Sequence, residues 1–198
     1  SSKISSAQIK SSILLSGLAA SGRTIFKEPG ESRNHTEKML SNLGAKIQSK
    51  TLEDGSYKVE LGGNPVLRSS NINVPCDPSS AAFLVVAAVI CPESKIELKN
   101  IMINKGRNGL FETLKEMGAK INIFNKKNNG GEETASIIAE YSQLQGITVP
   151  SKRVPSMIDE YPILSIAASC AEGKTIMDGI SELRVKESDR IKIISNGL

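Results

Sequence analysis

Apolar and polar residues follow one arrangement that occurs three times along the chain: an apolar helix, a short strand and then an amphipathic helix. The pattern predicts apolar helices over residues 11–20, 81–89 and 162–169, and following strands over 23–26, 95–98 and 175–177. Gly22 and Gly173 are the expected helix stops in the first and third copies. The repetition indicates a fold built from similar units.

The amphipathic helices are predicted over residues 35–43 and 109–117, where apolar residues recur at spacings of three and four. Both helices end in the sequence Gly-Ala-Lys-Ile. Its glycine, Gly44 or Gly118, can adopt the positive φ that turns a helix into a strand. A third such helix is predicted over residues 188–195, and there the sequence stops before a closing strand.

The segments between these elements complete the predicted organisation. Asp54 and Gly55 favour a hairpin turn between strands at 48–50 and 57–61, and residues 125–131 read as a polar loop. Each unit is therefore of the βαβαββ type. A proline-marked stretch over residues 68–78 is the candidate crossing between two domains. Because the chain starts at Ser1 and stops inside a repeat, we expect it to be an internal piece of a longer protein.

Composition excludes several classes of protein. The 25 Lys and Arg residues are interleaved with 21 Asp and Glu, for a net charge of +4, so neither a nucleic acid nor a membrane surface is an expected partner. No uncharged run approaches the roughly 20 residues of a membrane span. The three widely spaced cysteines, Cys76, Cys91 and Cys170, fit reduced thiols in the cytoplasm better than disulfides or zinc.

The strongest candidate for chemistry is the charged run at residues 183–190. On the helix that we predict there, Lys186 and Arg190 lie four residues apart on one face, with Glu187 between them. Two such cations repel each other, and Glu187 offsets this only in part. An anionic ligand between the cations would offset the rest, so the run predicts an anion site. The alternative is a solvated helix start with local ion pairs.

Two further candidates lie at predicted helix starts. Hydroxyl-bearing residues at 5–12 precede the first helix, where free N–H groups favour a phosphate or carboxylate, although Ser5 or Ser6 could simply cap it. Asp77 holds the matching place in the second copy, where we expect plain capping. In the third copy Asp159 and Glu160 precede a helix begun by Pro162, and Asp159 could cap that helix or act as a general base.

Other catalytic patterns are absent from the sequence. His35 is the sole histidine and no nucleophile elbow accompanies it, so a Ser-His-Asp triad is not indicated. Metal-ligand spacing, a phosphate-binding Walker loop and a dinucleotide fingerprint are also missing. Residues 106–109 read as a turn before a helix.

Five motifs occur in the order typical of one family. They are Ser-Ala-Gln at 6–8, Glu-Pro at 28–29 with Ser-Arg-Asn-His-Thr-Glu at 32–37, Asp-Pro-Ser-Ser-Ala-Ala at 77–82, Ile-Asp-Glu at 158–160, and Leu-Arg-Val-Lys-Glu-Ser-Asp-Arg at 183–190. On these motifs the chain resembles the 5-enolpyruvylshikimate-3-phosphate synthase family over nearly all its length, in a form similar to the glyphosate-tolerant bacterial enzymes.

The resemblance implies an inside-out α/β barrel fold of two domains, each made of three βαβαββ repeats, with the active site between them. Residues 1–70 would be the last βαβαββ unit of one domain. Residues 71–198 would be one full and one truncated unit of the second domain. This chain would thus hold an incomplete enolpyruvyl transferase fold.

The resemblance also implies a reaction and its residues. The enolpyruvyl group of phosphoenolpyruvate would pass to the 5-hydroxyl of shikimate 3-phosphate, releasing phosphate, with no metal or organic cofactor. Asp159 would take the hydroxyl proton and Glu187 would protonate the methylene carbon. Shikimate 3-phosphate would be bound by Ser6, Ala7, Gln8, Arg33, Asp159 and Lys186, and phosphoenolpyruvate by Gln8 and Arg190.

Some residues of the family have no counterpart here: its N-terminal Lys-Ser and Arg, its glyphosate-loop Gly and Arg, and its C-terminal His-Arg and Lys. We therefore expect this chain alone to be inactive, and the intact enzyme to be a cytoplasmic monomer. Two alternatives stay open: an enolpyruvyl transferase acting on UDP-N-acetylglucosamine, and a non-catalytic domain that binds anions.

Overall fold

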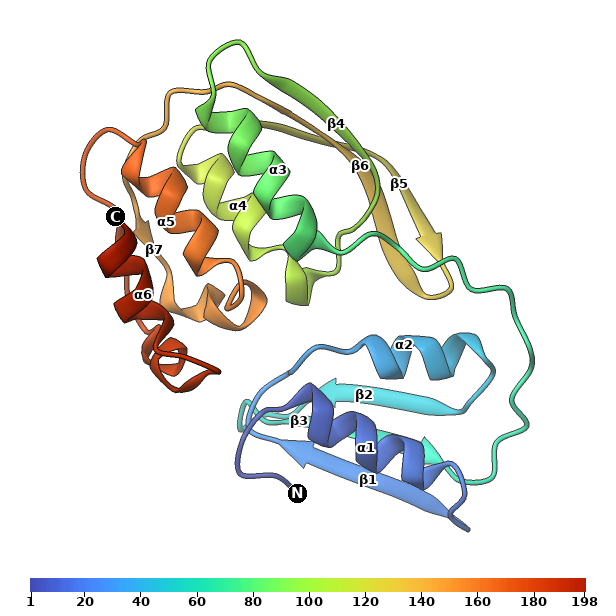
Figure 1. Cartoon of the computed structure of the whole chain (residues 1–198). Coiled ribbons are helices and arrows are strands. Elements are labelled where there is room, and N and C mark those ends of the chain that lie inside the picture. The colour runs from blue at the N-terminus through green and yellow to red at the C-terminus, as the bar shows by residue number, and fades with distance from the viewer. The chain divides into compact units, whose positions relative to one another are not determined.

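The computed structural model describes all 198 residues and contains two compact units. The first unit consists of residues 1–74 together with 128–132, and the second of residues 75–127 and 133–198. The boundary between Val74 and Pro75 lies inside the proline-marked stretch at 68–78. Figure 1 shows the elements of each unit.

The first unit is one α-β-α-β-β sequence of elements. Its elements are α1 (Ala7–Gly17), β1 (Arg23–Glu28), α2 (His35–Asn42), β2 (Ile47–Thr51) and β3 (Tyr57–Gly62). The strands form a three-stranded sheet in the order β1-β3-β2, in which the central β3 is antiparallel to both neighbours.

Alternation along β3 explains how this sheet is covered. Tyr57, Val59 and Leu61 are buried, whereas the residues between them are half-buried. These three side chains form one core cluster with Leu14 of α1 and Leu40 of α2. Both helices therefore pack on the same face of the sheet (Figure 1).

The second unit repeats the same order of elements and then begins it again. The repeat consists of α3 (Pro78–Ile90), β4 (Lys95–Met102), α4 (Gly109–Glu116), β5 (Lys120–Asn129) and β6 (Glu132–Glu140), with the short 3₁₀ helix η1 (Lys105–Arg107) before α4. The remainder consists of β7 (Thr148–Val149), η2 (Ser151–Ser156), α5 (Tyr161–Ser169), β8 (Ile176–Met177), η3 (Ser181–Val185) and α6 (Arg190–Gly197).

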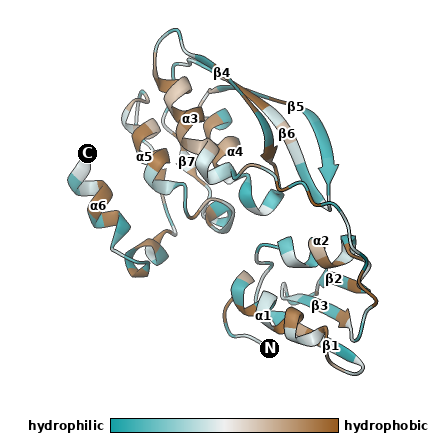
Figure 2. Ribbon diagram, turned by 45° about the vertical axis from the view of Figure 1, so that its right-hand side comes forward, coloured by the Kyte–Doolittle hydropathy of each residue, from teal (hydrophilic) through white to brown (hydrophobic).

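The second unit's strands form a sheet in the order β4-β6-β5 and a separate parallel pair, β7 and β8. A single core joins α3, α4 and α5 to this sheet through side chains such as Val85, Leu114, Ile137 and Leu164, each fully buried. In Figure 2, β5 is largely teal, which agrees with its mostly exposed burial pattern.

Helix α1 begins and ends several residues earlier than we predicted. It starts at Ala7 because Ser6 caps it, and it ends at Gly17 rather than Gly22. After Gly17 the backbone tightens, since Leu18 N–H and Ala19 N–H donate to carbonyls three residues back, at 3.2 and 3.3 Å. The helix end packs closely on β1: a Cβ at position 17 would lie 2.6 Å from Thr24 Oγ1.

The polar loop predicted over residues 125–131 is wrong. Strand β5 continues through residues 125–129, and only Gly130 and Gly131 form the turn to β6, with φ of +61° and +90°. Two successive positive φ values are what a tight hairpin of right-handed twist requires. The second half of β5 is polar and carries no apolar alternation, so the pattern concealed it.

The turns predicted at Gly44, Gly55 and Gly118 are confirmed, whereas Gly173 does not end a helix, because α5 already ends at Ser169. Gly44 and Gly118 end α2 and α4 with φ of +95° and +96°. Gly55, with φ of +79°, lies in the hairpin between β2 and β3. These turns depend on local chemistry, which the sequence shows directly.

Two further observations concern the whole chain. None of its helices combines the length and apolar character needed to cross a membrane. Cys76, Cys91 and Cys170 are all free and exposed.

Candidate functional site

The start of α1 is the first candidate site. Ser6 is the N-cap, and its hydroxyl accepts a hydrogen bond from Ile9 N–H at 3.4 Å, so the capping alternative is confirmed. Ala7 is half-buried and Gln8 is exposed in the first turn of the helix. The backbone N–H of Ser6 donates to Glu28 Oε2 at 3.1 Å, which anchors this turn to the end of β1.

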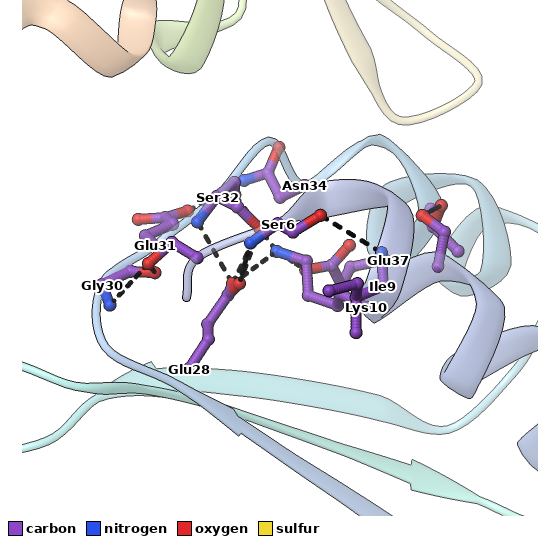
Figure 3. A network of polar contacts seen from close by, with 12 residues as sticks. Ser6, Ile9, Lys10, Glu28, Gly30, Glu31, Ser32, Asn34 and Glu37 are labelled. Carbon is purple, nitrogen blue, oxygen red and sulfur yellow. Dashed lines mark hydrogen bonds and ion pairs between the residues drawn. The ribbon is translucent and has the colours of Figure 1, made fainter. Parts of the chain in front are cut away.

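Behind this helix start lies a buried polar network that sequence reasoning missed. Lys10 Nζ lies 3.0 Å from Glu28 Oε1 and 2.8 Å from Glu37 Oε1, and it donates to the Ser32 carbonyl at 3.1 Å. Figure 3 shows these side chains pointing toward one another beneath the helix start. The available signal was position: Lys10 lies on the same stripe as the buried Leu14 and Gly17.

Arg33, the other residue expected at the phosphate, lies in the loop between β1 and α2 and is half-buried. Its neighbour Ser32 donates to Glu28 Oε1 from both its N–H, at 3.1 Å, and its hydroxyl, at 2.8 Å. The loop that carries Arg33 is thus held by the same carboxylate as the start of α1.

The charged run of the second unit does not form the helix that we predicted. Residues 181–185 form the 3₁₀ helix η3, Lys186 is extended, and α6 begins only at Arg190. Asp189 is the N-cap of α6 and accepts from Lys192 N–H at 3.0 Å. Because the cap fixes the helix start after Lys186, Lys186 and Arg190 do not share a helix face.

Local ion pairs occupy both cations, as the alternative interpretation anticipated. Lys186 pairs with Glu182, and Arg190 pairs with Glu187 at 2.7 Å. Arg190 also donates to Asp159 Oδ1 at 3.2 Å. The structure therefore brings Asp159, Glu187 and Arg190 into one cluster, with Lys186 in the adjoining extended segment.

Asp159 is not the N-cap of α5, so of the two roles left open for it, helix capping is not supported. The N-cap is Glu160, whose side chain makes no capping hydrogen bond. The buried Glu160 instead accepts from the hydroxyl of Ser79, near the start of α3. Asp159 itself is exposed, with 37% of its side chain accessible.

The sequence pattern did not predict the contacts around Glu160 and Ser79. Arg107 Nη2 donates to Ser79 Oγ at 2.7 Å and to Asp77 Oδ1 at 2.8 Å. Asp77 also caps α3 by accepting from Ser80 N–H at 2.9 Å, so the capping prediction there is confirmed. The predicted turn at 106–109 thus carries an arginine that ties η1 to the start of α3, where Ser79 in turn donates to Glu160.

The contact between Glu187 and Arg190 favours the ionised form of both side chains. Hydrogen bonds, first from its own backbone N–H and then from Arg190, lower the pKa of Glu187 below its ordinary value. The same Glu187 contact is the main cause that raises the pKa of Arg190. An arginine with two carboxylates can exchange either one for an anionic ligand, and an ionised carboxylate can accept a proton. No group of three or more His, Cys, Asp or Glu side chains is arranged to hold a metal ion.

Comparison with known proteins identifies relatives. The 3-phosphoshikimate 1-carboxyvinyltransferases of Bartonella henselae and Bartonella quintana are 51% and 52% identical to this chain over 195 residues. The match covers 98% of this chain and 44% of each relative, so the chain spans less than half the length of these curated relatives.

Solved structures agree. EPSP synthase from Acinetobacter baumannii is 46% identical, with a TM-score of 0.91 over 98% of this chain and 43% of that one. The enolpyruvyl transferase NikO from Streptomyces tendae, 18% identical with a TM-score of 0.57, shares the fold. These likenesses confirm the expected α/β fold as an incomplete enolpyruvyl transferase fold.

Comparison of the whole sequence with models of protein families also points to these enzymes. The family model of EPSP synthase (3-phosphoshikimate 1-carboxyvinyltransferase) matches residues 1–198. The chain therefore belongs to the EPSP synthase family.

Proposed function

We propose that the protein carrying this chain transfers the enolpyruvyl group of phosphoenolpyruvate to the 5-hydroxyl of shikimate 3-phosphate and releases phosphate. The observation that carries the proposal is the cluster of Asp159, Glu187 and Arg190, in which two carboxylates flank one guanidinium. Support also comes from relatives named 3-phosphoshikimate 1-carboxyvinyltransferase at 51% and 52% identity.

Asp159 is the proposed base for the acceptor hydroxyl. Its side chain is 37% exposed and can be reached by a ligand, and the N-cap of α5 is the neighbouring Glu160. As the 5-hydroxyl oxygen bonds to C2 of phosphoenolpyruvate, the hydroxyl proton passes to the Asp159 carboxylate. Asp159 also contacts shikimate 3-phosphate in this proposal.

Glu187 is the proposed acid for the methylene carbon of phosphoenolpyruvate. Its pKa is lowered partly by Arg190, so in the ligand-free arrangement it is held as the carboxylate. An anion that takes Arg190 from Glu187 removes part of that stabilisation and favours a protonated Glu187. Phosphoenolpyruvate, bound through Arg190, would in this way prepare its own proton donor.

Proton transfer to C3 and bond formation at C2 give a tetrahedral ketal phosphate. The Glu187 carboxylate then takes a proton back from the methyl group as the phosphate departs, which restores the double bond. Positioned cations lower the energy of these charged states because their dipoles and charges are fixed before the reaction.

The remaining residues are assigned to substrate binding. In the first unit Ser6, Ala7, Gln8 and Arg33 would contact shikimate 3-phosphate, and Gln8 would also contact phosphoenolpyruvate. N–H groups at a helix start and a nearby guanidinium are suited to a phosphate. In the second unit Lys186 would contact shikimate 3-phosphate.

The two units also support a proposal on domains. The order α-β-α-β-β occurs once in the first unit and once in the second, before α5 begins it again. We assign residues 1–70 to the last βαβαββ unit of one domain. Residues 71–198 then hold one full unit and part of another from the second domain. The free, exposed cysteines support a reducing, cytoplasmic location.

The test is phosphate release by the full-length protein that carries this chain. With shikimate 3-phosphate and phosphoenolpyruvate we expect turnover, and with UDP-N-acetylglucosamine as the acceptor we expect none. Release that requires UDP-N-acetylglucosamine would assign the protein to the sister reaction, and release with neither acceptor would refute enolpyruvyl transfer.

A further inference from the structure

The most unusual charge in the first unit is Lys10, whose side chain is fully buried. A buried ammonium is costly unless its charge is paired and its protons are bonded. Glu28 and Glu37 pair with it at 3.0 and 2.8 Å, and the ring of Tyr57 lies 5.1 Å away. Such an arrangement is far more demanding than an apolar side chain at the same place.

The partners of Lys10 lead to two separate binding segments. Glu28 accepts from the N–H of Ser6, directly before Ala7 and Gln8, at 3.1 Å. It also accepts from the N–H of Ser32, directly before Arg33, at 3.1 Å. Figure 3 shows these bonds converging on the Glu28 carboxylate, with Lys10 beside it.

Lys10 adds direct contacts to this junction. Its ammonium donates to the Ser32 carbonyl at 3.1 Å, so the Ser32 backbone is bonded through both its N–H and its carbonyl. Glu37 lies at the start of α2, and its carboxylate oxygens accept no hydrogen bond. Its ion pair with Lys10 is therefore the contact that offsets its buried charge. Loss of Lys10 would leave two nearly buried carboxylates with no cation between them, and they would repel each other.

We propose that Lys10 is a positioning residue for the phosphorylated acceptor. It holds the Ser6–Gln8 turn and the Arg33 loop at a fixed separation, and it acts through Glu28 and Ser32 because it is itself out of reach of any ligand. The proposal rests on the proposed function, which assigns both segments to shikimate 3-phosphate. A displacement of about 1 Å in a binding group can cost up to about 100-fold in activity.

The test compares Lys10→Met with Lys58→Met in the full-length protein, by calorimetric titration with shikimate 3-phosphate alone. Methionine keeps most of the apolar stem of Lys10 but removes its charge. Lys58 is the control because it pairs with Glu60 and lies in β3 of the same unit, between the buried Tyr57 and Val59, so it faces the side of the sheet opposite α1 and α2. We expect Kd to rise at least about tenfold for Lys10→Met and less than about twofold for the control.

A charge-matched variant distinguishes two effects of Lys10 on affinity: its role in holding the two binding segments in place, and its contribution to the local net charge. Lys10→Met changes the charge of the Lys10, Glu28 and Glu37 group from −1 to −2, and adding Glu37→Gln restores −1 without restoring the bridge. We expect the double variant to recover thermal stability while Kd stays high, and amides of residues 6–10 and 30–34 to exchange hydrogen faster than in the control. If Lys10→Met does not fold, the double variant decides in its place.

The outcomes are distinct. Kd within twofold of the wild type in a folded Lys10→Met protein, or in the double variant, overturns the positioning role alone. Recovery of Kd in the double variant also overturns it, because charge rather than the bridge would then set affinity. A wild-type protein without affinity for shikimate 3-phosphate overturns the proposed function and this inference together.

Discussion

Asp159→Asn in the full-length protein tests the proposed base most directly. Asparagine keeps the shape of the side chain and an oxygen that can accept from Arg190, now 3.2 Å from Asp159 Oδ1. It cannot take up the hydroxyl proton. A lost general base costs about 10²–10⁴ in kcat, which corresponds to about 2.7–5.4 kcal/mol at about 1.36 kcal/mol per tenfold.

Binding and stability should change far less than turnover. The Asp159–Arg190 pair is accessible, with 37% and 24% of the side chains exposed, and such pairs are worth about 0–1 kcal/mol. The N-cap of α5 is Glu160 rather than Asp159, so we expect little loss of helix stability. We therefore expect Kd for shikimate 3-phosphate to change less than about fivefold.

Phosphate release under saturating substrates gives kcat, and thermal denaturation reports folding. Asp178→Asn serves as the control, because Asp178 is another exposed aspartate of the second unit. A kcat within threefold of the wild type would refute the assignment of Asp159 as the base. A fall in kcat matched by an equal fall for Asp178→Asn would refute it as well.

Three further results are expected. Leu40→Ala, at a core position 1% exposed, should lower the free energy of unfolding by about 2–5 kcal/mol in chemical denaturation, and a change below about 1 kcal/mol would contradict the core described for the first unit. The folded protein lowers the pKa of Glu187. The ion pair of Glu187 with Arg190 therefore stabilises the fold above the ordinary pKa of 4.5, and this stabilisation is lost as the pH falls below that value. The Tm difference between wild type and Glu187→Gln should therefore shrink on acidification, and a difference that grows would contradict the ion pair. A polypeptide of these 198 residues alone should show no phosphate release above a heat-killed control, since exposed pairs worth about 0–1 kcal/mol each cannot hold so highly charged a substrate.

Local chemistry accounts for what the sequence predicted well. Positive φ at Gly44 and Gly118 and the cap at Asp77 each depend on a few neighbouring residues. Apolar periodicity likewise located α2 and α4 within a residue at their ends. Such features are encoded within a single turn or helix, so one sequence is enough to find them.

Features that depend on distant partners escaped prediction. The contact between Lys10 and Glu28 joins residues from different elements, and no spacing rule connects them. Arg107 looked like a turn residue because its partners, Asp77 and Ser79, lie on another helix. At residues 183–190 two local signals conflicted: i, i+4 charge spacing favoured a helix, whereas Asp189 was the cap that started it later.

Burial distinguishes two kinds of cation that look alike in the sequence. Lys10 and Arg190 each lie beside two carboxylates, yet Lys10 is fully buried and Arg190 is 24% exposed. Breaking a buried pair leaves an uncompensated charge that costs about 3–5 kcal/mol, whereas an exposed pair costs about 0–1 kcal/mol to exchange. An incoming anion can therefore compete for Arg190 at little cost and cannot compete for Lys10. This difference supports the two proposals, in which Arg190 binds a ligand and Lys10 holds the residues that bind one.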